Sequence, residues 1–202
     1  MEYLFLIVIL LFSVIIHEVA HGSVANLLGD PTAKLAGRLT LNPIKHLDLF
    51  GSFLVPLFLV VLRSPILFGW AKPVPINPYN FKNPKWDGAK SALAGPAVNI
   101  LVALVFGLVM RFLPLSDSLL AVFSVVVFIN LILAIFNLIP IPPLDGSHIL
   151  FGLLPERFAR VKLFLHQFGI FVLLFVIFFA LRWLFVIVAQ IHHLITGYQF
   201  II

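Results

Sequence analysis

Long apolar stretches constrain the fold of this 202-residue chain more than any other feature. Residues 91–110, 118–139 and 163–181 contain no charged side chain, and each is long enough to cross a bilayer as a helix. Residues 3–28 would form a fourth helix of about 39 Å. Apolar character resumes after Arg182, so the last stretch is either one long helix or a span followed by an interfacial piece. The sequence therefore predicts an all-α polytopic membrane protein with four to six transmembrane helices.

The composition excludes several classes of protein. Hydrophobic residues make up 62% of the chain and charged residues 10%, against about 45–50% and about 25% in soluble domains. A disordered chain, a nucleic-acid-binding protein and an ordinary water-soluble enzyme are therefore excluded, and the lipid bilayer is an expected partner. The absence of cysteine rules out disulfides and thiolate zinc sites. We expect one membrane-embedded domain over residues 1–202, without a cleaved signal peptide.

Residues 51–70 are apolar but do not resemble an ordinary span. Their uninterrupted core, Phe53–Leu62, is short and contains Pro56, which is more typical of a re-entrant segment. Charge supports this interpretation. If residues 51–70 enter the membrane and return, segments 29–90 and 139–162 share one side and carry 11 of the 13 Lys and Arg residues. The positive-inside rule then predicts that this side is cytoplasmic and that the N-terminus is outside.

The first predicted helix contains the sequence HEVAH at residues 17–21. His17 and His21 are one turn apart on one helix face, so both imidazoles can reach a single metal ion. Glu18 lies about 100° around the helix, where it can reach a metal-bound water as a general base. Ionisable side chains inside a membrane are costly and usually functional. The alternative is a pair of histidines that hydrogen-bond to neighbouring helices.

A catalytic zinc site usually has three protein ligands, and Asp145 is the best candidate for the third. Three prolines break the helix just before it, at positions 140, 142 and 143. Irregular backbone at membrane depth is tolerated where it is buried in protein or lines a wet cavity. The alternative is an N-cap for a helix at Gly146–Leu154. Asp145 meets the histidines only if residues 29–90 and 139–162 share one side, which the charge pattern also favours.

Three further features carry weaker functional predictions. Asn99 is a lone amide on an otherwise apolar helix, and both Asn99 and Asn137 can bind substrate or a developing oxyanion. Each can equally form a hydrogen bond between helices. Residues 35–41 alternate in polarity and predict a short β-strand, whose edge could bind an extended substrate.

These motifs resemble the site-2 protease family of intramembrane zinc metalloproteases, in its compact prokaryotic form. The resemblance runs from about residue 4 to residue 155, and no segment is long enough for the PDZ or CBS domains of larger members. It is carried by HEVAHG at 17–22, GPAVN at 95–99, NLIPIPPLDG at 137–146, GRLTLNP at 37–43 and GWAKPVP at 69–75. Some members have Arg three residues after the aspartate, where this chain has His148, which is not taken as a ligand.

The resemblance implies one zinc ion held by His17, His21 and Asp145, with Glu18 as the general base. It implies hydrolysis of peptide bonds in or near transmembrane segments of membrane proteins. Such an enzyme would lie in the cytoplasmic membrane of a prokaryote, with its active site open to the cytoplasm. The main alternative is a transporter of metal ions or protons, because intramembrane His, Glu and Asp also build ion pathways. The substrate and the oligomeric state remain open.

Overall fold

The computed structural model describes residues 2–62 and 71–200, and these residues form only helices and connecting loops. In chain order the elements are α1 (Glu2–Leu27), α2 (Thr32–Leu35), η1 (Pro43–His46), η2 (Leu49–Leu54), α3 (Val55–Val61), η3 (Pro78–Asn80), α4 (Pro84–Phe112), α5 (Asp117–Asn137), α6 (Asp145–Leu153), η4 (Glu156–Phe158) and α7 (Ala159–Thr196). This confirms the predicted all-α class.

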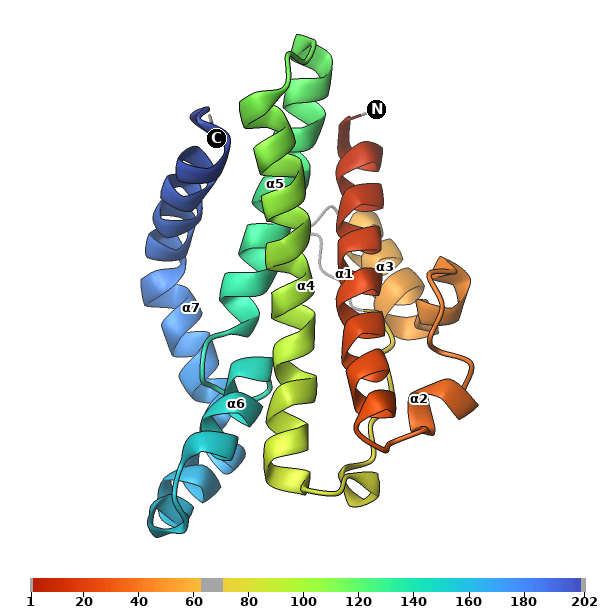
Figure 1. Ribbon diagram of the computed structural model, residues 1–202, viewed down its shortest axis with the longest axis vertical. Helices are drawn as coiled ribbons and strands as arrows, with labels where there is room; N and C mark the ends of the chain where they lie inside the picture. The colour runs from red at the N-terminus through yellow and green to blue at the C-terminus, as the bar shows by residue number, and fades with distance from the viewer. Residues whose placement is uncertain (1, 63–70, 201–202) are drawn as a thin grey trace.

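Four of the described helices are long and apolar enough to cross a membrane, namely α1, α4, α5 and α7. They confirm the four predicted spans. In Figure 1, α1 and α5 run downward and α4 and α7 run upward, so that successive spans alternate in direction. α7 is one continuous helix of 38 residues, or about 57 Å. It ends at Thr196, and the C-cap residue Gly197 has a φ of +79°, which suits a residue without a side chain.

The chain between α1 and α4 leaves and returns at the same end of the molecule (Figure 1). Near this end the Asn80 side-chain amide donates a hydrogen bond of 2.7 Å to the Asp30 carboxylate. The two ends of the connection therefore lie on the same side, as the return path predicted for residues 51–70 requires, and the entry of this segment into the membrane stays a prediction. The described part of that segment comprises most of η2, all of α3 and Leu62. Residues 63–70 lie outside the described part of the chain.

α4 occupies the centre of the bundle and packs against α1, α5, α6 and α7. A buried apolar cluster joins α4, α5 and α7 in the half of the molecule nearer the two termini, and it includes Ala103, Met110, Val127, Phe128, Leu131 and Val188. The opposite half of α4 is lined by smaller or polar buried residues such as Ser91 and Gly95. Small side chains allow helices to approach closely. α1 and α6 meet α4 in this second half.

The short β-strand predicted at residues 35–41 is not formed. Leu35 ends α2, and Gly37 then turns the chain with a φ of +64°. Leu35 and Leu41 are 82% and 54% exposed, so the alternating apolar residues do not share a buried face. Alternating polarity produces a strand only where a neighbouring strand completes its hydrogen bonds. The described chain provides no such neighbour for residues 35–41.

Candidate metal centre

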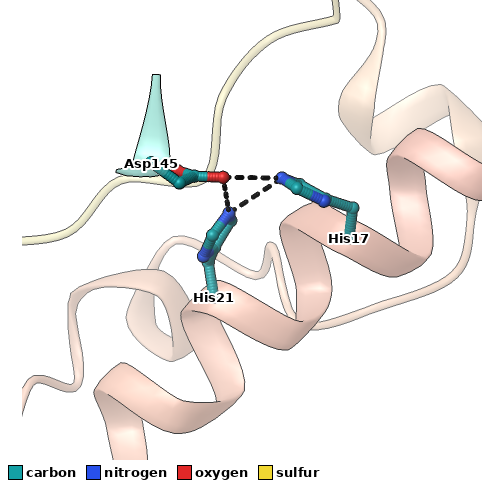
Figure 2. A group of neighbouring side chains, drawn as sticks. All are labelled: His17, His21 and Asp145. Carbon is teal, nitrogen blue, oxygen red and sulfur yellow. Dashed lines mark hydrogen bonds and ion pairs between the residues drawn. The ribbon is translucent and has the colours of Figure 1, made fainter. Parts of the chain in front are cut away.

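Three side chains from two distant parts of the sequence meet inside the bundle (Figure 2). His17 and His21 extend from one face of α1, and Asp145 comes from the first residue of α6. The two histidine Nε2 atoms are 3.0 Å apart, and Asp145 Oδ2 lies 3.1 Å from His17 Nε2 and 3.2 Å from His21 Nε2. Both histidines are 6% exposed. The three atoms therefore form a nearly equilateral triangle.

The triangle has the size expected of three ligands on one zinc ion. Zinc–nitrogen bonds of about 2.0–2.1 Å in a tetrahedral site place ligand atoms about 3.3 Å apart. The observed separations of 3.0–3.2 Å are within a few tenths of this value. Two imidazole nitrogens and one carboxylate oxygen are also a donor set that zinc commonly takes. Since three protein ligands leave a fourth position open, the arrangement suits a catalytic rather than a structural ion.

A chain of buried amides fixes the orientation of the His17 ring. Asn130 Nδ2 donates to the Val126 carbonyl at 2.9 Å, which directs Asn130 Oδ1 toward Asn99. Asn99 Nδ2 donates to that oxygen at 2.7 Å, so Asn99 Oδ1 faces His17 Nδ1 at 2.5 Å. Asn99 Oδ1 only accepts, and His17 Nδ1 must therefore carry the proton. The His17 Nε2 lone pair is left for a metal ion.

His21 is oriented by a backbone acceptor on α4. Its Nδ1 donates to the Ser91 carbonyl at 2.7 Å, and the Ser91 hydroxyl donates back to the His21 carbonyl at 3.1 Å. The His21 Nε2 lone pair is therefore also available to a metal ion. α4 can approach this closely because residue 95 is glycine. A Cβ atom at Gly95 would lie 2.6 Å from His17 Nε2 and closer still to His21 Nε2.

Asp145 begins α6, outside the four spans, but it does not cap that helix. The N-cap position belongs to Leu144, which makes no side-chain capping bond. Asp145 Oδ2 lies within 3.2 Å of Nε2 of both histidines, and a carboxylate binds metal in its ionised form.

Glu18 and the three donors line one cavity of about 460 Å³. Glu18 Oε2 accepts a hydrogen bond of 2.7 Å from the Val74 backbone N–H, which lies in the loop before α4. Asn137 lines the same cavity, although its Nδ2 donates to the Leu133 carbonyl of its own helix. Substrate, metal ligands and a carboxylate base can therefore meet in this space.

Asn99 lies behind His17 and is fully buried, and it is not among the described residues that line the cavity. Its contacts favour orientation of His17, and its substrate-binding role remains a prediction, as does that of Asn137.

Sequence reasoning missed Asn130 and Ser13. The Ser13 hydroxyl accepts a hydrogen bond of 2.9 Å from Asn130 Nδ2. A signal for both was present. Asn130 is another amide in an apolar span, and Ser13 precedes His17 by one helical turn.

A buried His–His–carboxylate triangle at a cavity that also contains a glutamate is the donor set expected of a metal-dependent hydrolase in a membrane-spanning bundle. Comparison with known proteins gives the same class. A family model described as peptidase family M50 matches residues 114–178. YwhC of Bacillus subtilis, provisionally named a zinc metalloprotease, is 40% identical over 184 residues, which are 85% of this chain and 80% of YwhC.

Two further relatives are more distant. Rip2 of Mycolicibacterium smegmatis, also provisionally named a zinc metalloprotease, is 32% identical over 145 residues, or 67% of this chain and 52% of Rip2. The zinc metalloprotease MJ0392 of Methanocaldococcus jannaschii is 25% identical over 157 residues, or 78% of this chain and 36% of MJ0392. No solved structure matches the chain.

The chain therefore belongs to peptidase family M50, the site-2 protease family of zinc metalloproteases. It is an integral membrane protein with several spans and a zinc-dependent peptidase. This result decides against the metal-ion or proton transporter that the sequence alone left open.

Proposed function

We propose that the chain is an intramembrane zinc endopeptidase, which hydrolyses peptide bonds in or near transmembrane segments of membrane proteins. His17, His21 and Asp145 hold the zinc ion, and Glu18 is the general base. One membrane-embedded domain, residues 1–202, carries the whole site. The observation that carries the proposal is the triangle of donor atoms, which opens on the cavity lined by Glu18.

The depth of the site supports a substrate within the membrane. His17 lies ten residues before the end of α1 at Leu27, or about 15 Å along the helix axis. The apolar span of α1 runs from Phe5 to Leu27, so both histidines lie within it. A peptide bond that reaches this cavity must enter the same layer. Residues of the loop before α4, such as Val74 and Ile76, also line the cavity.

Each protein group has a separate task in this reaction. Zinc, when bound, supplies a Lewis acid that activates water and the scissile carbonyl. Glu18 accepts the proton from the attacking water and delivers it to the leaving amine nitrogen. The Val74 N–H holds one Glu18 oxygen at 2.7 Å and so keeps the carboxylate beside the cavity. Asn99 and Ser91 hold the histidine rings by their Nδ1 atoms.

The distribution of charge supports an active site that opens to the cytoplasm of a prokaryote. Segments 29–90 and 139–162 carry 11 of the 13 Lys and Arg residues. The end of α1, the start of α4 and α6 all lie toward the same end of the bundle, while α3 lies beside the middle of α1 (Figure 1). Cytoplasmic loops carry an excess of basic residues.

The test is Glu18→Gln, with Glu156→Gln, at the first residue of η4, as the matched control. The purified, zinc-loaded variants are reconstituted in vesicles with a library of single-span membrane proteins that carry a fluorescent tag on one end. We expect Glu18→Gln to retain zinc and lose cleavage, and Glu156→Gln to cleave like the wild type. Cleavage by Glu18→Gln at the wild-type rate would contradict the role of Glu18. A wild type that holds zinc and cleaves no reporter would contradict intramembrane proteolysis.

A further inference from the structure

Arg38 is a buried cation that contacts main-chain carbonyls. Its side chain is 7% exposed, and within residues 2–62 and 71–200 its recorded hydrogen bonds go only to backbone oxygens. It donates to the carbonyls of Lys45 and of Lys72, the latter at 2.5 Å, with a longer contact of 3.4 Å to Pro73. Buried guanidinium groups usually pair with a carboxylate. Here the guanidinium joins two loops of the backbone instead.

The two loops contain the motifs GRLTLNP and GWAKPVP, for which the proposed function has no task. The Lys72 N–H donates to the His46 carbonyl at 2.9 Å, next to the bonds that Arg38 makes. His46 is fully buried, and its Nε2 contacts the Thr40 carbonyl at 2.8 Å. Residues 38–46 therefore form one hydrogen-bonded support for the start of segment 72–77.

Asp30 holds the other end of the same segment. It is fully buried, and its Oδ2 accepts from the Asn77 N–H at 2.7 Å. Its Oδ1 accepts from Asn80 Nδ2 at 2.7 Å and from the Thr32 N–H at 3.1 Å. Burial raises the pKa of Asp30, but the hydrogen bonds from Thr32, Asn80 and Asn77 outweigh it and lower the pKa. The carboxylate is therefore ionised at neutral pH.

Val74 lies between the two anchors and contacts α1 directly. Its side chain is 7% exposed, and a Cβ atom added at Gly22 would lie 2.7 Å from Val74 Cγ1. Its N–H donates to Glu18. Segment 72–77 reads KPVPIN, so proline removes two of its six amides. Three of the four remaining N–H groups donate hydrogen bonds. Lys72 donates to the His46 carbonyl, Val74 to Glu18 and Asn77 to Asp30.

We infer that Arg38 and Asp30 are positioning residues that fix the two ends of segment 72–77 and thereby hold the Val74 N–H against Glu18. Because this donor is a backbone group, its position is set by whatever anchors the segment. The anchors act on the base and not on the metal ligands, since Asn99 and the Ser91 carbonyl orient the two histidines and Asp145 belongs to α6. The consequence for catalysis rests on the proposed role of Glu18.

The test is amide hydrogen exchange in the zinc-loaded, full-length chain in detergent, which needs no substrate. The variants are Arg38→Gln, Asp30→Asn and the control Arg160→Gln, which removes an exposed arginine at the start of α7. Arg38→Gln should speed exchange at Lys72 and Val74 at least tenfold and leave Asn77 protected. Asp30→Asn should speed exchange mainly at Asn77. Both variants should keep the wild-type zinc content, and Arg160→Gln should match the wild type throughout.

Turnover of a cleaved reporter from the tagged library gives the second readout. Arg38→Gln should lower kcat at least tenfold with little change in KM, and Arg38→Lys, which has one donor group, should restore part of it. Wild-type amide exchange in segment 72–77 of both variants would overturn the inference. So would a variant that loses its zinc together with the protection of these amides. If Arg38→Gln does not fold, Asp30→Asn decides by the same criteria. Wild-type cleavage by Glu18→Gln would instead refute the proposed function and leave the exchange result standing.

Discussion

Replacing Gly95 by alanine is expected to empty the metal centre while the helical bundle stays folded. Gly95 lies on α4 where that helix faces the two histidines of α1. The added Cβ atom would lie 2.6 Å from both Cε1 and Nε2 of His17, and closer to Nε2 of His21. The rings cannot rotate freely, because Asn99 and the Ser91 carbonyl hold their Nδ1 atoms.

The size of the displacement follows from these distances. Ordinary contacts of a Cβ atom begin near 3.4 Å, so its separation from Nε2 must grow by about 0.8 Å at His17 and about 1.0 Å at His21. Zinc sites tolerate deviations of about 0.2 Å in ligand distance. The site therefore loses a ligand, and its zinc affinity should fall by more than the 10–100-fold typical of changes around the ligands.

The assay measures zinc per chain and zinc affinity in purified protein, by mass spectrometry and competition with a chelator. Gly88→Ala is the matched control, because Gly88 lies on the same helix and lines the same cavity, and an added Cβ atom there meets nothing within 4 Å. Gly88→Ala should bind zinc like the wild type, and both variants should keep their helical circular dichroism. Zinc affinity in Gly95→Ala equal to that in Gly88→Ala would refute the reasoning.

Further predictions test the support of the site and the path of the chain. Asn130→Leu removes the shorter of two hydrogen bonds from Asn99 Nδ2 and leaves only the 3.3 Å bond to the Ser13 carbonyl, so it should weaken zinc binding about 10–100-fold; unchanged affinity in a chelator competition would exclude this effect. Gly146→Ala places a Cβ atom against the Leu138 and Ile139 carbonyls and should lower zinc content by displacing α6; wild-type content would contradict that. Single cysteines at Lys34 and Lys85 should be labelled from the same side of the membrane, and labelling from opposite sides would contradict the return path.

Most of the fold could be predicted from the sequence, because apolar length is a local property. The four spans follow from long uncharged apolar runs, and the break before Asp145 follows from the three prolines that precede it. The return path also followed, from charge and ligand geometry together. The strand at 35–41 could not be judged locally, because a strand depends on a partner, and the guanidinium of Arg38 shapes this loop instead.

In the candidate site too, only the features encoded locally could be predicted. The metal donors were predicted because His17 and His21 share a helix face and Asp145 follows three prolines. The hydrogen bond from Val74 to Glu18 could not be predicted, because every residue other than proline carries the same backbone donor. The amide chain from Asn130 to His17 depends on side chains 113 positions apart, whose contact only the packing of α1, α4 and α5 creates.

The zinc content of the purified chain, wild type beside Asp145→Ala, tests the central claim most directly because it needs no substrate. Asp117→Ala is the control, since Asp117 begins α5 at the opposite end of the bundle. The wild type and Asp117→Ala should hold about one zinc per chain, and Asp145→Ala should lose most of it. Wild-type zinc content in Asp145→Ala would show that the three donors do not form the metal site.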